Sequence, residues 1–84
     1  MNIINVKVCY ITPTDKYHLQ DKKAMLICDS LAVGSAMMME FEEGGSLRTS
    51  KIESIYEDEA TIEVKTKNSI YKLNIIKEET KDGR

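Results

Sequence analysis

Residues 60–76 alternate between apolar and polar side chains on both sides of the pair Lys67-Asn68. Folding the chain about that pair puts Thr66 opposite Ser69 and gathers the apolar side chains on one face of a two-stranded sheet. The expected apolar pairs are Val64 with Tyr71, Ile62 with Leu73 and Ala60 with Ile75, and the polar pairs are Glu63 with Lys72 and Thr61 with Asn74. A shift of one residue would set apolar side chains against polar ones. The segment therefore predicts a β-hairpin of fixed register.

Two more strands are expected nearer the N-terminus. Residues 3–12 have the alternation of a half-buried strand, and Pro13 ends it because proline has no backbone N–H. The side chains expected to face the core are Ile4, Val6, Val8 and Tyr10. After a loop to about Asp21, the apolar run 23–28 is interpreted as a strand that ends in a bend. A short helix within 21–33 is the alternative, since periodicity alone does not separate the two.

A second hairpin is expected around Glu43-Gly44-Gly45, which fits a three-residue loop with a left-handed glycine after a type I turn. The strand before this loop includes Met37, Met38 and Met39. With that loop, the expected pairs are Phe41 with Leu47, Glu40 with Arg48 and Met39 with Thr49. The next strand begins at Ser46 and bends near Ser50-Lys51, and the acidic turn 57–59 leads into the first hairpin.

Five or six short strands in 84 residues predict one mainly β domain over residues 1–76, folded as a small SH3-like antiparallel barrel. Closing the sheet removes the exposed edges that so small a sheet would otherwise leave. Residues 77–84 are charged and are expected to form a flexible tail. Because a core of this size leaves a stability margin of only about 3–5 kcal/mol, we expect a homo-oligomer.

Net charge and hydropathy limit the partners and the cellular compartment that we expect for this protein. The formal net charge is −2, so non-specific nucleic-acid binding, which needs basic charge to displace counterions, is not expected. No stretch reaches the length of a membrane span, and the N-terminus lacks the pattern of a signal peptide. We therefore expect a cytoplasmic protein without a membrane partner.

A family resemblance supports the expected fold. The segment Gly45-Ser-Leu-Arg-Thr-Ser-Lys-Ile-Glu-Ser-Ile55, followed by Ile62-Glu-Val-Lys-Thr-Lys-Asn-Ser-Ile-Tyr-Lys-Leu73, resembles the C-terminal half of small SH3-like β-barrel proteins of Firmicutes and their phages. In that family a strand ending in Thr-Ser bends into the next one, and a hairpin with Thr-x-Asn-Ser-x-Tyr-x-Leu closes the sheet. The resemblance covers about half of the chain and implies a phage or mobile-element origin, but no catalytic residues.

Enzyme chemistry and cofactors are not expected. His18 is the single histidine and lies in a polar loop without a positioned partner, so it is interpreted as a loop residue and not as a general base. No spacing of Cys9, Cys28 and His18 is typical of a metal site. We therefore predict neither a metal ion nor a cofactor.

Met37, Met38 and Met39 are candidates for a protein interface. Neighbouring residues of a strand point to opposite faces, so Met38 cannot share the core with both Met37 and Met39. Either a partner subunit covers the second face of this strand, or Met38 is displayed there for binding.

Arg48, Thr49 and Ser50 are the best candidates for ligand binding. An arginine with two hydroxyls at a strand bend can bind a phosphate or a carboxylate. Tyr71 is included as a stacking surface, and Tyr56 is considered for the same role. In the alternative interpretation, Arg48 pairs with Glu40 and Ser50 stabilises the bend.

Together these observations predict a non-enzymatic binding protein with an anti-defence role. It would sequester an anionic small molecule, such as a signalling nucleotide, or block a host protein. The alternative is a structural or regulatory subunit of a larger assembly. Folding leaves three features unexplained, and activity is expected there: Met38, Arg48 and the loop around Tyr17 and His18.

Overall fold

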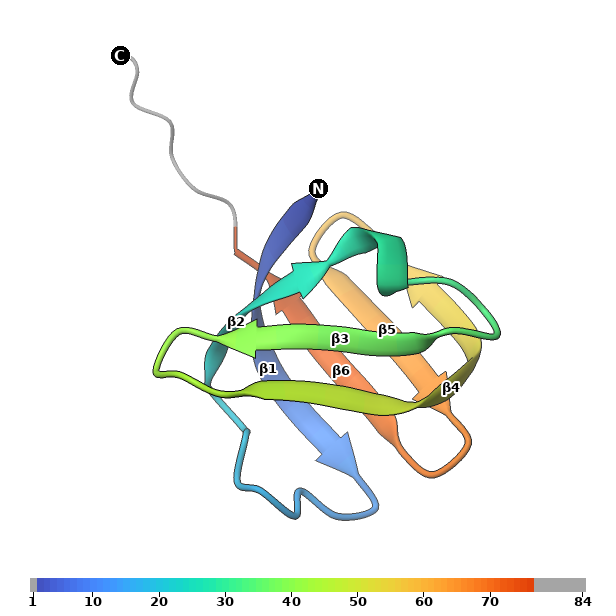
Figure 1. Ribbon diagram of the computed structural model, residues 1–84, viewed down its shortest axis with the longest axis horizontal. Coiled ribbons are helices and arrows are strands. Elements are labelled where there is room, and N and C mark those ends of the chain that lie inside the picture. Colours follow the sequence, from blue (N-terminus) through green and yellow to red (C-terminus); the bar gives the residue numbers. More distant parts are fainter. Residues whose placement is uncertain (1, 77–84) are drawn as a thin grey trace.

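Six antiparallel strands form a single sheet that closes into a barrel (Figure 1). The computed structural model describes residues 2–76, so the predicted tail 77–84 lies outside the described residues. The elements are β1 (Ile3–Thr12), β2 (Lys23–Ile27), the short 3-10 helix η1 (Cys28–Ser30), β3 (Ala36–Phe41), β4 (Ser46–Glu57), β5 (Thr61–Thr66) and β6 (Ile70–Ile75). Each strand pairs with the next, and β1 pairs with β6. The predicted small antiparallel β-barrel is confirmed.

The β5–β6 hairpin has the register that the alternation of residues 60–76 predicts. All the central pairs agree: Thr61 with Asn74, Ile62 with Leu73, Glu63 with Lys72 and Val64 with Tyr71. At the turn, the amide of Thr66 donates to the carbonyl of Ser69 at 2.8 Å. The Thr66 side chain is 2% exposed, and its hydroxyl accepts hydrogen bonds from the amides of Asn68 and Ser69. The turn is thus held by its own threonine.

Residues 23–27 form a strand, as expected, and the short helix considered within 21–33 is limited to the three residues of η1. A bend follows, as expected, in the form of η1. The hydroxyl of Ser30 donates to the carbonyl of Ile27 at 2.6 Å and accepts the amide of Met38 at 2.9 Å. This side chain therefore takes the place of a β2 carbonyl as the partner of β3, which allows β2 to end early.

The outward position of Tyr10 corrects the expected pattern of β1. The pairing between β1 and β6 shifts register between Val8 and Tyr10. A bulge of this kind adds one residue to the strand and reverses the facing of the residues after it. Tyr10 is consequently 39% exposed, whereas Ile11 packs against the core.

The β3–β4 hairpin has a register different from the expected one. The observed pairs are Met39 with Leu47, Glu40 with Ser46 and Met38 with Arg48. The amide of Gly44 donates to the carbonyl of Phe41 at 2.9 Å, so the turn comes one residue earlier than predicted. Gly44 and Gly45 both have positive φ, 109° and 89°, and either can end the turn. Since the pairing shifts by two residues, every side chain keeps its predicted face.

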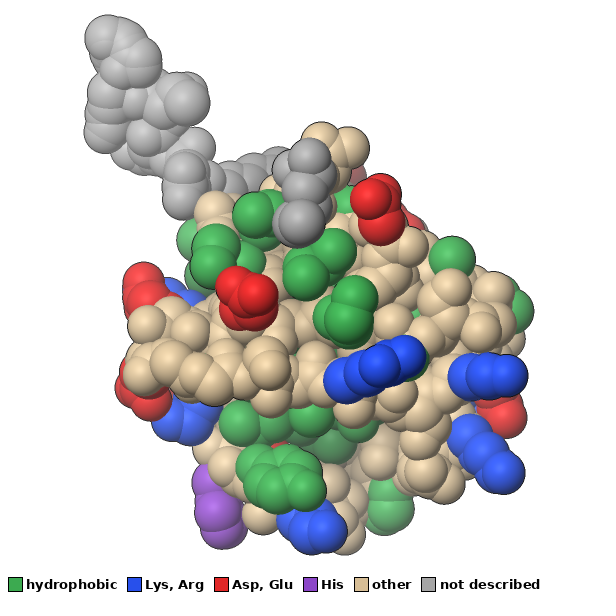
Figure 2. Space-filling view, in the orientation of Figure 1, with side chains coloured by type: hydrophobic (Ala, Val, Ile, Leu, Met, Phe, Trp, Pro, Cys, Tyr) green, Lys and Arg blue, Asp and Glu red, His purple; other side chains and the backbone are tan. Residues whose placement is uncertain are grey.

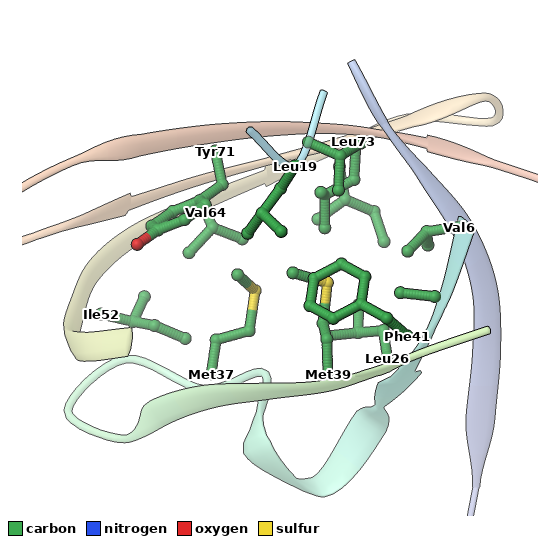
Figure 3. Packing of buried hydrophobic residues seen from close by; sticks show 13 residues of the cluster. Val6, Leu19, Leu26, Met37, Met39, Phe41, Ile52, Val64, Tyr71 and Leu73 are labelled. Carbon is green, nitrogen blue, oxygen red and sulfur yellow. The ribbon is translucent and has the colours of Figure 1, made fainter. Parts of the chain in front are cut away.

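The core is a single cluster of apolar side chains inside the barrel (Figure 3). Its buried members are Val6, Val8, Leu19, Ala24, Leu26, Met37, Met39, Phe41, Ile52, Ile62, Val64, Tyr71 and Leu73. Met37 and Met39 point into the barrel side by side and are 0% and 1% exposed. Leu19 comes from the β1–β2 loop and fills the end of the barrel that this loop covers. No helix among residues 2–76 has the length and apolar character of a membrane span.

Candidate ligand-binding site

The first half of β4 has a strand neighbour on one side only. It pairs with β3 from Ser46 to Lys51, whereas the ladder with β5 begins at Ile52. The β1–β2 loop, residues 13–22, lies below this half of β4, and the β5–β6 turn closes the gap at its far end (Figure 1). Side chains from the loop and from both hairpins therefore meet at a break in the barrel wall.

A hollow of about 300 Å³ occupies this break, and we call it the polar hollow. All four ligand-binding candidates of the sequence line it: Arg48, Thr49, Ser50 and Tyr71. Further side chains around it come from the β1–β2 loop and the β5–β6 turn, and include Lys16, Tyr17 and Asn68. Three separate segments of the chain, 11–19, 47–50 and 68–71, thus converge on one concave surface.

Thr49 is a framework residue of this site. It is 9% exposed, and its hydroxyl accepts the amide of Met37 at 3.0 Å and donates to the carbonyl of Ser50 at 2.7 Å. The β3–β4 pairing shifts register between Ala36 and Met38, so the amide of Met37 is satisfied by this side chain. The hydroxyl proton of Thr49 is therefore already used within the fold.

Ser50 joins the two sides of the break. The side-chain amide of Asn68 donates to the Ser50 hydroxyl oxygen at 2.6 Å, linking β4 to the β5–β6 turn. Because a hydroxyl both donates and accepts, Ser50 keeps its own proton for a ligand. The predicted role of Ser50 in stabilising the bend and a role in binding are compatible with this geometry.

Tyr71 lies at the boundary between core and hollow. Its ring belongs to the core, and its hydroxyl oxygen points away from the centre of the cluster (Figure 3). Burial raises the pKa of the Tyr71 phenol, and a hydrogen bond with Ser69 opposes that shift in part. Tyr71 therefore presents a neutral hydroxyl near neutral pH. Tyr56, the other tyrosine considered, is 64% exposed on the second half of β4 and does not line the hollow.

The β1–β2 loop holds Tyr17 in a defined position. The Asp15 carboxylate accepts the amides of Leu19 and Gln20, each at 2.8 Å, and Leu19 is anchored in the core. Between these two fixed points Tyr17 is 63% exposed, with the Lys16 ammonium 5.5 Å from its ring centroid. The sequence predicts activity in this loop, but it does not place Lys16 and Leu19 beside Arg48. Leu19 is the single leucine of this polar loop, and it is the sequence feature that could have indicated that the loop is anchored in the core.

The polar hollow has an excess of unpaired positive charge. Within residues 2–76, neither Lys16 nor Arg48 forms an ion pair, and the predicted pairing of Arg48 with Glu40 is replaced by Met38 opposite Arg48. Asp15 is the one carboxylate on the hollow, and both of its oxygens accept backbone amides. An anion entering here therefore meets two cations that form no ion pair among the described residues, with Lys16 lying over the Tyr17 ring.

A second surface lies on the outer side of β1, β2 and β3. Met38 is 38% exposed there, with Met25 and Ile3 also exposed, and Figure 2 shows hydrophobic side chains over β2 and β3. Met37 and Met39 are core residues, so only Met38 of the three predicted interface residues is accessible. An outer hollow of about 620 Å³ borders Met38 and shares Arg48, Thr49 and Ser50 with the polar hollow. It lacks Tyr71 and instead includes Lys51 and the carboxyl-bearing Asp29.

Neither a metal centre nor a known relative defines the site. Among residues 2–76, no three His, Cys, Asp or Glu side chains lie close enough together to hold a metal ion. Comparisons with protein-family models, with curated proteins and with solved structures give no match. The functional argument therefore depends on the geometry of the hollow.

Proposed function

We propose that this protein is a non-enzymatic binding module that holds an anionic small molecule with an aromatic ring, such as a nucleotide, in the polar hollow. The carrying observation is the convergence of Arg48, Thr49, Ser50 and Tyr71 with Lys16 on one concave surface. The predicted phage or mobile-element origin is consistent with a protein that sequesters a signalling nucleotide of its host.

The chemistry of the lining supports an anionic ligand. Arg48 and Lys16 can each form charge-assisted hydrogen bonds with a phosphate, and the Ser50 hydroxyl supplies a neutral donor. Tyr17 adds an exposed ring that can stack on a base. The volume of about 300 Å³ is at the lower end of the range for small-molecule sites, which favours a ligand of mononucleotide size.

The same lining supports binding without turnover. General acid–base catalysis requires a titratable group that is free to exchange a proton with the substrate. Neither histidine nor cysteine lines the polar hollow, and its one carboxylate, that of Asp15, is held by two backbone amides; we assign the remaining titratable side chains, Lys16, Tyr17 and Tyr71, to contacts with the ligand. The side chains present can orient and hold an anion.

The outer face carries a second candidate function. Met38, Met25 and Ile3 expose apolar surface on three neighbouring strands, which favours capture of a host protein or incorporation into a larger assembly. Besides host-protein capture and incorporation into an assembly, this face could also join two copies of the chain in a homo-oligomer. These alternatives need no small ligand.

Native mass spectrometry of protein purified from a nucleotide-rich lysate tests the proposal. We expect wild-type protein to carry a bound small anion, and the spectrum also gives the subunit count. Lys16→Ala and Arg48→Ala should each lower retention about tenfold or more, because a hydrogen bond to a charged group contributes about 1.5–3 kcal/mol. Lys7→Ala, an exposed lysine of β1 away from the hollow, is the matched control.

Two results would contradict the proposal. One is a wild-type spectrum without any added mass; the other is retention that both variants leave unchanged. Met38→Gln separates the second candidate function, since it replaces the exposed apolar side chain without adding a charge opposite Arg48; it should weaken protein capture and leave anion retention intact.

A further inference from the structure

A second hollow continues the polar one along β4 toward the β3–β4 turn. Its volume is about 420 Å³, and we call it the apolar hollow. Tyr17, Leu19, Leu47 and Arg48 line both hollows. Figure 2 shows a recess with hydrophobic side chains between the β4 band and the β1–β2 loop. The two hollows are therefore neighbouring parts of one surface, with Tyr17 at their boundary.

The two parts differ in chemistry. Beyond the shared residues, the apolar hollow is lined by Phe41, Gly44, Gly45 and Ser46. The polar hollow instead adds hydroxyl, amide and ammonium groups from Thr14, Lys16, Ser50, Asn68 and Ser69. One end thus suits an uncharged ring, and the other suits a charged group with several hydrogen-bond acceptors.

The glycine pair keeps the apolar end open. Gly44 and Gly45 have φ values of 109° and 89°, a conformation that side-chain-bearing residues rarely adopt. A methyl group added at either position would contact nothing within 4 Å, so the space above the turn is free. A planar ring could therefore lie against bare backbone here, with Tyr17 and Phe41 as the aromatic residues of the same hollow.

The walls of the apolar end are fixed to each other. The Lys22 ammonium contacts the Glu43 carboxylate at 2.6 Å, which ties the β1–β2 loop to the β3–β4 turn. The hydrogen bond and charge of Lys22 lower the pKa of the Glu43 carboxyl, which favours its ionised form. Leu19 and Phe41, each 9% exposed, form the floor between these walls.

We propose that the two hollows form one bipartite site for a nucleoside phosphate. The base lies in the apolar hollow, between Tyr17, Phe41 and the glycine turn. The phosphate lies in the polar hollow, against Lys16, Arg48 and Ser50. This inference rests on the proposed function and deepens it, because it gives the ligand a direction and excludes compact inorganic anions as the main ligand.

Calorimetric titration with matched probes tests this arrangement. The probes are AMP, GMP, CMP and UMP, the corresponding nucleosides, and inorganic pyrophosphate. Ser46→Phe fills the apolar hollow from an exposed strand position that the polar hollow does not share. Ser54→Phe, on the second half of β4 and away from both hollows, is the control for adding a ring.

We expect a substitution in the apolar hollow and one in the polar hollow to weaken the binding of different probes. Ser46→Phe should weaken the tightest nucleoside and its monophosphate at least tenfold and leave pyrophosphate unchanged. Lys16→Ala should weaken pyrophosphate and the monophosphate and leave the nucleoside unchanged. Ser54→Phe should bind all probes as the wild type does.

This experiment distinguishes a failure of the bipartite site from a failure of the proposed anion-binding function. If Ser46→Phe weakens no probe while Lys16→Ala still weakens the monophosphate, the bipartite site is wrong and the anion-binding function stands. If wild-type protein binds neither the monophosphates nor pyrophosphate, the proposed function fails, and the bipartite site fails with it. Thermal melting that matches between the two phenylalanine variants shows that both are folded.

Discussion

The β5–β6 hairpin and the first half of β4 border the same break in the barrel wall, but they use their side chains differently. In the hairpin, Ile62, Val64 and Leu73 are fully buried, and Thr66 closes the turn. In residues 46–50 of β4, only Thr49 is buried, and it serves the backbone of β3. A strand with neighbours on both sides commits its side chains to folding, whereas a strand with one neighbour leaves some of them free.

The loop beside β4 explains how the barrel tolerates this break. Leu19 plugs the core, and the Asp15 carboxylate holds the loop in shape through two backbone amides. Lys16, Tyr17 and Arg48 are among the side chains that remain exposed at the break. Function is therefore proposed where the loop, and not a strand, completes the wall.

The largest effect is expected for Ile62→Ala in the hairpin. Ile62 is 0% exposed and pairs with Leu73, so truncation removes buried surface and leaves a cavity. The free energy of unfolding should fall by about 2–5 kcal/mol, measured by urea denaturation. Lys65→Ala, on the outer face of the same strand, should change it by less than about 0.5 kcal/mol. Equal losses in the two variants would refute the described packing.

An intermediate effect is expected for Thr49→Val. The change keeps the shape of the side chain but removes the acceptor of the Met37 amide, whose loss costs about 1–3 kcal/mol for a buried donor. Thr49→Ser keeps the hydroxyl and should retain most of the stability. Hydrogen exchange of the Met37 amide should be faster in the valine variant alone. Unchanged exchange there would mean that another group satisfies this amide.

A smaller effect, dependent on pH, is expected for Tyr71→Phe. Near neutral pH the variant loses the hydrogen bond with Ser69, worth about 0.5–1.5 kcal/mol. Because burial raises the pKa of the folded phenol, the unfolded chain ionises first as the pH rises above about 10. The stabilising effect of Tyr71 is complete below that pH and is lost as the pH rises through the folded pKa.

Chemical denaturation at pH 8 and above pH 10 measures this difference. The stability advantage of wild type over Tyr71→Phe should shrink at the higher pH. Tyr56→Phe, which removes a hydroxyl from a side chain 64% exposed, is the matched control. A constant advantage across this range would show that the Tyr71 phenol is not protected by burial.

The sequence determines the hairpins to different degrees. In the β5–β6 hairpin, apolar and polar side chains alternate from Ala60 to Lys65 and from Tyr71 to Ile75, so one register pairs like with like along most of its length, with Lys65 opposite Ile70 as the exception. In the β3–β4 hairpin, Gly44 and Gly45 can each end the turn, and the two registers keep the same faces. The bulge in β1 that turns Tyr10 outward depends on pairing with β6, far away in the chain, and local alternation carries no sign of it.

The candidate site was predictable only in part. Arg48, Thr49, Ser50 and Tyr71 are recognisable as polar or aromatic residues near a strand bend, and they do meet at one hollow. The contributions of Lys16 and Asn68 depend on how the β1–β2 loop and the β5–β6 turn cross the break in the wall. Such tertiary proximity has no local signature. Likewise, the burial of Met37 and Met39 follows from strand alternation, but a partner for Met38 does not.

The most direct measurement is a map of backbone amide chemical shifts in ¹⁵N-labelled protein, titrated with the tightest nucleoside monophosphate. The account predicts that the largest shifts fall in residues 14–19 and 44–50, with further shifts at 68–71. Shifts confined to the outer face, at Ile27, Asp29 and Met38, would place the ligand in the outer hollow and contradict the account. An unchanged spectrum at saturating nucleotide would contradict nucleotide binding altogether.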